Sequence, residues 1–306
     1  MDYLLYAFHI ALLLFWTRLW SVPSKEFYFN PFLSGTARLT DSVLVFLRPV
    51  LALPEQAAAC AVLLFILFFK TVVLWRLGGD WLIQLGMSFE FAPRAADGQF
   101  APVLLFSALQ AALFLVRLWT VYLLVRLITP AARTTRAGEA LAFFARPFSD
   151  IPLFIQPVVL FALHALLALC VTRLEAFHAF ADFGQAIQPM SDQAAAPSPF
   201  LSGPLYAQLL KTGWLAALSF ADGLMLLTRG LVILIVGNFV SAMFQSRGVA
   251  IICSEGVELL MGRFARRVGA GTGFDFTPLI FFFVINLLYT SICQGLSNLI
   301  RSPYLN

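Results

Sequence analysis

The sequence predicts an all-α integral membrane protein with about six transmembrane helices, arranged as three helix-pair repeats that each carry an amphipathic connector helix. The composition is the first reason, because 60% of the residues are hydrophobic and only 12% are charged, with a mean hydropathy of +0.87. The second reason is that several apolar runs approach or exceed the roughly 20 residues that cross a ~30 Å hydrocarbon layer as a helix. These runs are continuously apolar and lack the alternation of membrane β-barrel strands.

Six apolar runs are the predicted spans. They cover residues 3–20, 57–77, 103–128, 153–171, 218–243 and 279–296. We expect the first run to be a retained helix and not a signal peptide, because no basic residue precedes it and the first positive charge, Arg18, follows its apolar part. Residues 80–102 are expected to be a linker. Residues 172–217, rich in Ala, Pro, Ser and Gln, are expected to form a mobile external loop that leads into the fifth span.

Charge and cysteine content argue against several functions. The net charge of +4 and the pI near 9.0 come from basic residues scattered among apolar helices, so no direct contact with nucleic acid is expected. The four cysteines form no close pair and are expected to be small packing residues. The sequence has no Cys/His metal spacing, no phosphate-binding glycine loop after a strand and no nucleophile, base and acid set. We therefore expect a non-enzyme that holds no cofactor or metal.

Three segments repeat one order of elements: an apolar helix with an arginine, a connector with an acid and a later arginine, and a second helix. Arg-Leu-Trp-Ser-Val at residues 18–22 matches Arg-Leu-Trp-Thr-Val at residues 117–121, 99 positions later. In the third segment, Arg229 and the threonine before it echo Arg18 and its own preceding threonine. The predicted repeat units cover residues 1–79, 103–171 and 218–306.

The connectors also repeat a spacing between an acid and an arginine. Asp41 is followed seven residues later by Arg48, and Glu139 is followed seven residues later by Arg146. In both cases a proline comes directly after the arginine. In the third connector, a pair of arginines begins eight residues after Glu258. An acid in the first turn and arginines near the last turn complement the dipole of a helix.

Each connector is expected to be an amphipathic helix, with Thr40 and Ser254 as predicted N-caps. Two interpretations are open: an interfacial helix whose arginines bind lipid phosphates, or a docking surface for a partner protein or anionic lipid. Twelve basic residues flank the connectors and five lie on the opposite side, which predicts cytoplasmic connectors and periplasmic termini. The candidate partner or headgroup contacts are Arg38, Arg48, Arg136, Arg146, Arg263, Arg266 and Arg267.

Four candidate functional residues within the spans are charged: Lys70, Arg117, Asp222 and Arg229. An arginine at the centre of a span costs at least ~2.5 kcal/mol on insertion scales and needs a partner or water. Asp222 lies seven residues before Arg229, on nearly the same helix face, so an ion pair between them is one expectation. The recurring arginine has two interpretations. It is either a recurring lock between a helix pair and its connector, or part of a transport path.

Several of these motifs resemble a known family. They are Arg18-Leu19-Trp20-Ser21, Asn30-Pro31, Arg38-Leu39-Thr40-Asp41, Arg48-Pro49 and Gly273-Phe274-Asp275-Phe276-Thr277-Pro278. Their order and spacing resemble the YggT family of small bacterial and plastid membrane proteins. Asp41 stands where that family usually has Glu, and the family typically has one or two units, so the resemblance implies a triplicated or fused member. The positions that carry it are Asn30, Pro31, Asp41, Pro49, Glu258, Gly273, Asp275 and Pro278.

The resemblance implies a broad range of functions and no catalytic activity. Family members are linked to osmotic tolerance, membrane-complex biogenesis, cytochrome assembly in plastids and the organisation of division or nucleoids. We therefore expect a non-enzymatic, multi-pass protein of the bacterial inner membrane that assembles, organises or stabilises a membrane protein complex. Its expected partners are membrane lipids, including anionic headgroups, and other membrane proteins. The alternative is a small-ion channel or transporter linked to osmotic tolerance, with an anion as the favoured ion.

Overall fold

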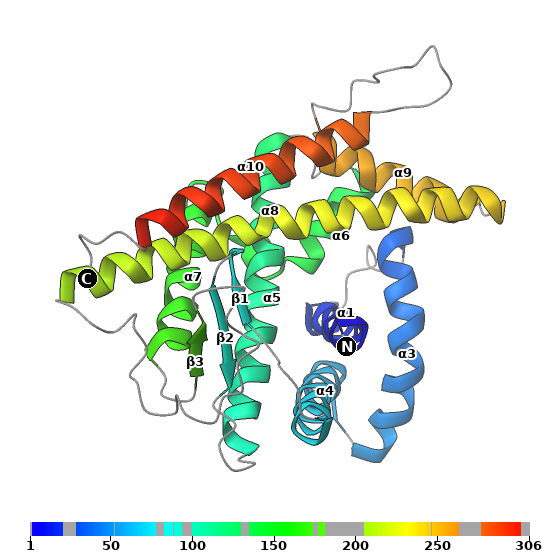
Figure 1. Cartoon of the computed structure of the whole chain (residues 1–306). Helices are drawn as coiled ribbons and strands as arrows, with labels where there is room; N and C mark the ends of the chain where they lie inside the picture. Colours follow the sequence, from blue (N-terminus) through cyan, green and yellow to red (C-terminus); the bar gives the residue numbers. More distant parts are fainter. Residues whose placement is uncertain are drawn as a thin grey trace. The chain divides into compact units, whose positions relative to one another are not determined.

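A computed structural model describes residues 2–20, 29–51, 53–77, 83–87, 89–93, 100–129, 135–173, 177–180, 205–245, 247–262 and 277–300. Most of them are helical (Figure 1). The helices are α1 (Asp2–Trp20), α3 (Pro31–Leu51), α4 (Glu55–Leu77), α5 (Phe100–Ile128), α6 (Arg136–Phe144), α7 (Gln156–Arg173), α8 (Leu205–Met243), α9 (Arg247–Met261) and α10 (Thr277–Ile300), with a short 3₁₀ turn, η3 (Phe148–Asp150), after α6. The prediction of a mainly helical chain is confirmed.

Within the part of the chain that the structure describes, four helices are long and apolar enough to cross a membrane. The qualifying segments are Glu55–Arg76, Phe100–Ile128, Leu205–Ser241 and Thr277–Ile300. In the first and fourth predicted runs, the described apolar segments, Leu5–Trp20 of α1 and Gln156–Thr172 of α7, are shorter. The fourth is shorter because a turn occupies residues 153–155, and the helix begins only at Gln156. The multi-pass membrane character is thus supported by four helices, and six spans stay a prediction.

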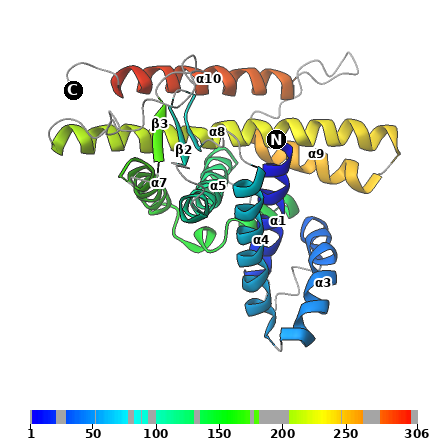
Figure 2. The same cartoon turned by 60° about the horizontal axis from the view of Figure 1, so that its bottom comes forward.

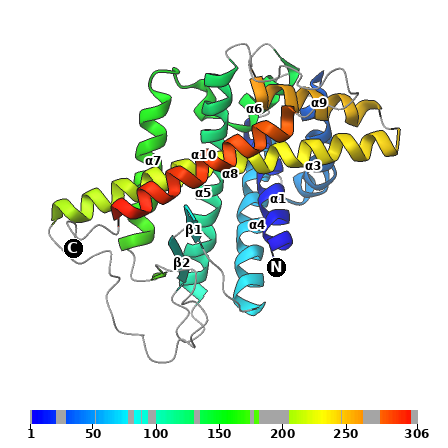
Figure 3. The same cartoon turned by 45° about the horizontal axis from the view of Figure 1, so that its top comes forward.

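A small antiparallel sheet, with strand order β1-β2-β3, adds to the helical fold. Its strands are β1 (Ile83–Leu85), β2 (Phe89–Pro93) and β3 (Phe177–Phe180). Ile83 pairs with Phe91, Leu85 pairs with Phe89, and Phe91 also pairs with Ala179. Figure 3 shows β1 and β2 beside α5. The sequence analysis predicted no strands in these linkers, because apolar alternation over three to five residues is too short to distinguish from a polar connection.

The chain divides into two compact units, each drawn from all three predicted repeats. Unit 1 comprises Met1–Phe68, Leu118–Gln156 and Leu226–Ile285, and unit 2 comprises Phe69–Arg117, Pro157–Met225 and Asn286–Asn306. The helices α4, α5, α8 and α10 contribute residues to both units. Each unit has its own set of polar contacts between segments that are distant in sequence.

Unit 1 is organised around its connectors. Helices α1, α3 and α6 contact one another, and α6 contacts α9. Figure 2 shows α1, α3 and α4 side by side. One apolar cluster joins these three helices through Phe15, Leu44, Ala58, Ala59 and Val62. A second cluster joins α3 to α6 through Leu33, Ala37, Ala140 and Phe143. Alanines in both clusters permit close approach of the helices.

The caps of the connector helices differ from the predicted ones. Helix α3 begins at Pro31 and not at Thr40, because Asn30 is its cap: the Asn30 side-chain oxygen accepts a hydrogen bond from the Phe32 N–H at 3.0 Å. The Thr40 hydroxyl instead donates to a carbonyl one turn back. Ser254 likewise lies inside α9. Both predicted N-caps are therefore wrong, since each helix begins several residues earlier.

The cysteines are free thiols, and Cys253 has the clearest packing role. Its sulfur lies against Gly237, where a Cβ would come within 2.9 Å of it, so α8 and α9 approach closely at this pair. Burial raises the pKa of the Cys253 thiol. The thiol therefore stays protonated and fills space, as the sequence predicts for the cysteines.

Candidate functional site

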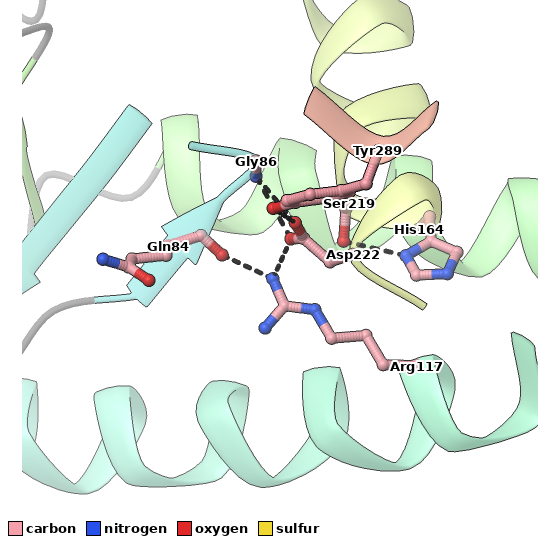
Figure 4. Close-up of polar contacts among 7 residues, drawn as sticks. All are labelled: Gln84, Gly86, Arg117, His164, Ser219, Asp222 and Tyr289. Carbon is pink, nitrogen blue, oxygen red and sulfur yellow. Dashed lines mark hydrogen bonds and ion pairs between the residues drawn. The ribbon is translucent and has the colours of Figure 1, made fainter. Parts of the chain in front are cut away.

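The main polar cluster of unit 2 surrounds the carboxylate of Asp222 on α8 (Figure 4). The Gly86 N–H, in the turn after β1, lies 3.1 Å from each carboxylate oxygen, and the Tyr289 hydroxyl donates to one of them at 2.9 Å. The Arg117 guanidinium forms an ion pair with the carboxylate and also donates to the Gln84 carbonyl. One buried acid therefore joins α5, α8, α10 and β1.

Burial explains why Asp222 needs so many donors. A carboxylate removed from water without partners costs several kcal/mol or more, and hydrogen bonds to charged groups recover roughly 1.5–3 kcal/mol each. Asp222 is buried and receives an arginine, a tyrosine hydroxyl and a backbone amide. The arrangement satisfies both charges and holds them in place. The Asp222 cluster therefore holds α5, α8, α10 and the turn after β1 together.

Glycine is required at position 86 for two separate reasons. Gly86 has a φ of +65°, a conformation that residues with a Cβ rarely adopt. A Cβ at this position would also lie 2.8 Å from a methyl carbon of Leu218 on α8. The tight fit brings the backbone amide of the hairpin close to the helix, where it reaches Asp222.

A second contact in unit 2 pairs two buried side chains. His164 on α7 and Ser219 on α8 are hydrogen-bonded at 2.8 Å between Nδ1 and Oγ. The His164 ring also meets Phe220 edge-on, with ring centroids 5.7 Å apart. With both contacts, His164 is a hydrogen-bonded packing residue of the helical bundle. These contacts fasten α7 to α8.

Lys70 differs from the other charged residues of the spans. It lies on α4 and is only 1% exposed, and its amine has no hydrogen-bond partner among the residues that the structure describes. A buried ammonium without a partner is unfavourable in a span. Lys70 is therefore the one candidate of the four whose environment does not explain its presence.

In unit 1, Arg18 near the end of α1 forms the predicted lock. The buried guanidinium pairs with Asp41 on α3 and with Glu55 at the start of α4, the latter at 3.4 Å. One arginine thus joins the first helix, the connector and the second helix of the first predicted repeat. This contact matches the interpretation of the recurring arginine as a link between a helix pair and its connector.

The matching arginines of the other repeats have different partners. Arg117 pairs with Asp222 and not with the acid of its own connector. Arg229 is exposed and donates to the Tyr6 hydroxyl at 2.7 Å. The expected pair between Asp222 and Arg229 is therefore wrong, because the carboxylate turns to an arginine on another helix. Of the three arginines, only Arg18 is seen to pair with the acid of its own connector.

Hydrogen bonds tie the first two connectors together in unit 1. The Asn30 amide donates to the Arg136 carbonyl at 2.8 Å and reaches a carboxylate oxygen of Glu139 at 3.4 Å. The Trp16 indole of α1 donates to the Arg146 carbonyl at 2.9 Å. Asn30 therefore has two roles, as the cap of α3 and as a bridge to α6. It gives the Asn-Pro motif a structural purpose.

The candidate headgroup contacts lie in varied surroundings. Arg38 and Arg136 are exposed, whereas Arg146 is half-buried with its guanidinium 4.7 Å from the centre of the Phe143 ring. Arg48 and Pro49 lie in the last turn of α3, where only the backbone is described. Of the motif residues, Pro31 begins α3, Glu258 is exposed on α9, and Pro278 is the second residue of α10. Five positions lie outside the described residues: Arg263, Arg266, Arg267, Gly273 and Asp275.

Several residues of these clusters were missed by the sequence analysis. Glu55, Gln84, Gly86, Tyr289 and Tyr6 each contact a charged candidate. Two of the contacts are made by backbone groups, the Gln84 carbonyl and the Gly86 N–H, and a backbone contact cannot be predicted from the type of residue. A useful signal was the glycine between two short apolar alternations, since such a glycine often marks a turn or a close backbone approach.

Comparison with known proteins gives no further assignment. No protein-family model, no curated protein and no solved structure matches this chain. Within the described residues, no group of three or more His, Cys, Asp or Glu side chains is placed to hold a metal ion.

Proposed function

We propose that this protein is a non-enzymatic, multi-pass protein of the bacterial inner membrane that assembles, organises or stabilises a membrane protein complex. The main support is the surface of α3, a connector helix that is firmly fixed on one face and open on the other. Fixation by ion pairs and hydrogen bonds lowers the entropy lost when a partner binds. Such a helix suits a docking role.

The two faces of α3 differ sharply in burial. Leu33, Ala37 and Leu44 are buried against α1, α4 and α6. Leu39 and Phe46 are 64% and 70% exposed, although both are large and apolar. An exposed apolar stripe on a rigid element is typical of a surface that contacts membrane or another protein.

Two networks fix the first half of α3 to its neighbours. Asn30 holds its first turn to α6, and Asp41 in its middle pairs with the buried Arg18 of α1. The stripe therefore has a defined orientation relative to α1 and α6. A helix fixed in this way is already folded before a partner binds. It therefore suits a partner surface better than would a helix that becomes ordered only on contact with lipid.

The satisfied charges at depth support the same proposal. Asp222 and Arg117 neutralise each other, and Arg229 is bonded to Tyr6. Charges held in this way link elements that are distant in sequence. A role in holding a fixed shape follows more directly than a role in moving ions.

The motif contacts also support the proposed relation to the YggT family. Asn30 and Pro31 begin the connector helix, and Asp41 receives the arginine of the first helix. We propose that these motif residues serve to fix the connector to its helix pair. On this view the motif specifies a shape and needs no reactive group.

The test is co-purification of the full-length chain from native membranes with a C-terminal tag. The wild-type protein is expected to recover one reproducible set of membrane proteins. Leu39→Ala combined with Phe46→Ala should lower that recovery several-fold, because it removes the exposed stripe. The matched control, Val284→Ala with Leu287→Ala, removes a similar exposed pair from α10 and should leave recovery unchanged. A chain that comes without partners, or a stripe variant that keeps them fully, would overturn the proposal.

A second function is favoured by one observation, the buried and unpaired Lys70. We propose as the alternative a small-ion channel or transporter linked to osmotic tolerance, in which Lys70 attracts an anion. In proteoliposomes, Lys70→Met should then abolish chloride flux, while Arg76→Gln at the exposed end of α4 should not. Equal flux with wild-type protein, with the Met variant and with empty liposomes would remove this alternative.

A further inference from the structure

The connector region of unit 1 contains a pocket of about 420 Å³. Small-molecule sites have volumes of about 300–1,000 Å³, so a compact polar group fits. Residues of α3, α6 and η3 line the pocket. Its polar lining comes from Asn30, Glu139, Arg146, Ser149 and Asp150.

Among the described residues that line the pocket, Arg146 is the one cation, and the surrounding structure holds it in place. The Arg146 guanidinium lies over the Phe143 ring at 4.7 Å, and one of its nitrogens reaches the Trp20 carbonyl at 3.5 Å. A guanidinium has five N–H donors and binds phosphate oxygens in a forked geometry. Arg146 therefore offers an oriented phosphate contact at the pocket wall.

Two carboxylates line the same pocket. Glu139 accepts from the Asn30 amide at 3.4 Å, and Asp150 accepts from Ser149 at 3.5 Å. Both acids are exposed, so they can also accept from a ligand. Together with Arg146 they give the pocket one positive and two negative charges, a pattern that disfavours a purely anionic ligand.

This pattern matches a ligand that joins a phosphate to a primary ammonium. The ammonium of an ethanolamine group donates three hydrogen bonds, as a lysine side chain does, and carboxylates accept them. A choline group has no N–H to donate, and a phosphoglycerol group would place only negative charge beside the two acids. We propose that this pocket binds a phosphoethanolamine group, supplied as the headgroup of a phospholipid.

Exposed apolar residues beside the pocket favour the lipid as the source. Phe29 directly precedes Asn30 and is 84% exposed. Phe154 follows Asp150 by four residues and is 80% exposed, with two further exposed apolar neighbours, Leu153 and Ile155. Such side chains insert at the boundary between headgroups and acyl chains. The pocket then lies at headgroup level, a placement that rests on the membrane setting proposed above but not on the assembly role.

The test uses the full-length chain in nanodiscs of equal parts phosphatidylethanolamine, phosphatidylcholine and phosphatidylglycerol, followed by native mass spectrometry of retained lipid. The wild type is expected to retain the ethanolamine lipid about tenfold over either other lipid, since each charged hydrogen bond changes affinity by about that factor. Glu139→Gln with Asp150→Asn should reduce this preference to near parity. Arg146→Gln should weaken retention of all three lipids.

Two control variants and a soluble probe complete the design. Arg247→Gln and Glu255→Gln change single charges on α9, outside the pocket, and should keep the full preference. Free phosphoethanolamine at millimolar concentration should not displace the lipid. Displacement at that level would make the free compound the ligand and overturn the lipid proposal, as would absence of any ethanolamine preference in the wild type. Partner recovery is measured in the same variants, so a failed lipid site and a failed assembly role give different results.

Discussion

Two arginines in matching motifs, Arg18 in unit 1 and Arg117 in unit 2, are stabilised in contrasting ways. Arg18 is buried and pairs with two acids, Asp41 and Glu55, from its own predicted repeat. Arg117 is partly exposed and pairs with one acid, Asp222, 105 positions away in the third predicted repeat. The first cluster has a spare carboxylate, and the second does not. Although the two motifs are similar in sequence, Arg117 depends on one acidic partner, whereas Arg18 has two.

The largest effect is expected from removing Asp222, the carboxylate that pairs with Arg117 in unit 2. Asp222→Ala leaves Arg117 without its counter-ion and leaves the Gly86 amide and Tyr289 hydroxyl without an acceptor. We expect a loss of about 3–5 kcal/mol in the free energy of unfolding, measured by denaturant unfolding in detergent micelles. Arg117→Met combined with Asp222→Leu should recover much of that loss, because it removes both charges. A double variant as unstable as Asp222→Ala would contradict the ion-pair account.

The spare carboxylate of unit 1 should reduce the effect of a single change there. Asp41→Asn leaves Glu55 to pair with Arg18, so we expect a loss of about 1–3 kcal/mol, less than for Asp222→Ala. Glu55→Gln should lower the free energy of unfolding more in the Asp41→Asn variant than in the wild-type protein, because either acid can pair with Arg18 when the other is missing. Unfolding of the two single variants and the double variant measures this coupling. Strict additivity would show that the acids act independently.

A smaller effect is expected from the backbone contact of unit 2. Gly86→Ala places a Cβ against Leu218 in a left-handed conformation, and we expect a loss of about 1–2 kcal/mol. Leu218 is itself buried, so the double variant is compared with Leu218→Ala alone. In that background Gly86→Ala should cost less, because the contact is gone, but not nothing, because the backbone strain stays, so rescue should be partial. Full rescue would assign the whole effect to packing. Thermal unfolding in detergent, with all three variants side by side, gives the comparison.

The smallest effect is expected at the third arginine of the series. Tyr6→Phe removes the hydroxyl that accepts from Arg229, which is exposed. Exposed polar contacts contribute about 0–1 kcal/mol, so stability should change by less than 1 kcal/mol. A loss comparable to that of Asp222→Ala would mean that Arg229 also serves as a central joint.

The sequence predicted the helices of this fold better than the contacts between them. Long apolar runs identify the four membrane-length helices because burial in lipid requires continuous hydrophobicity. The recurring arginine predicted a link between the first helix and its connector, but the acid that pairs with Arg18, Asp41, is known only from the structure. The pair between Arg117 and Asp222 was not predicted, since hydropathy carries no information on which distant helix supplies a partner. The expected Asp222 and Arg229 pair was wrong for the same reason.

Helix starts and short strands were the other points of difference. Thr40 and Ser254 have the residue types of N-caps, but helical structure begins earlier because Asn30 and Pro31 provide a stronger start for α3. The strands of the hairpin are three and five residues long, below the length at which alternation is informative. The longer strand, β2, also pairs with β3, which comes from the other linker.

The bond from the Gly86 amide to Asp222 has a practical consequence for labelling the protein. A connection between two spanning helices is ordinarily the preferred place for an epitope tag, a protease site or a reporter fusion. Here one residue added between Leu85 and Phe89 would shift the amide away from the carboxylate and reverse the strand faces. Tags that report sidedness are better inserted elsewhere, because a tag in this hairpin would alter the joint whose surroundings it was meant to report.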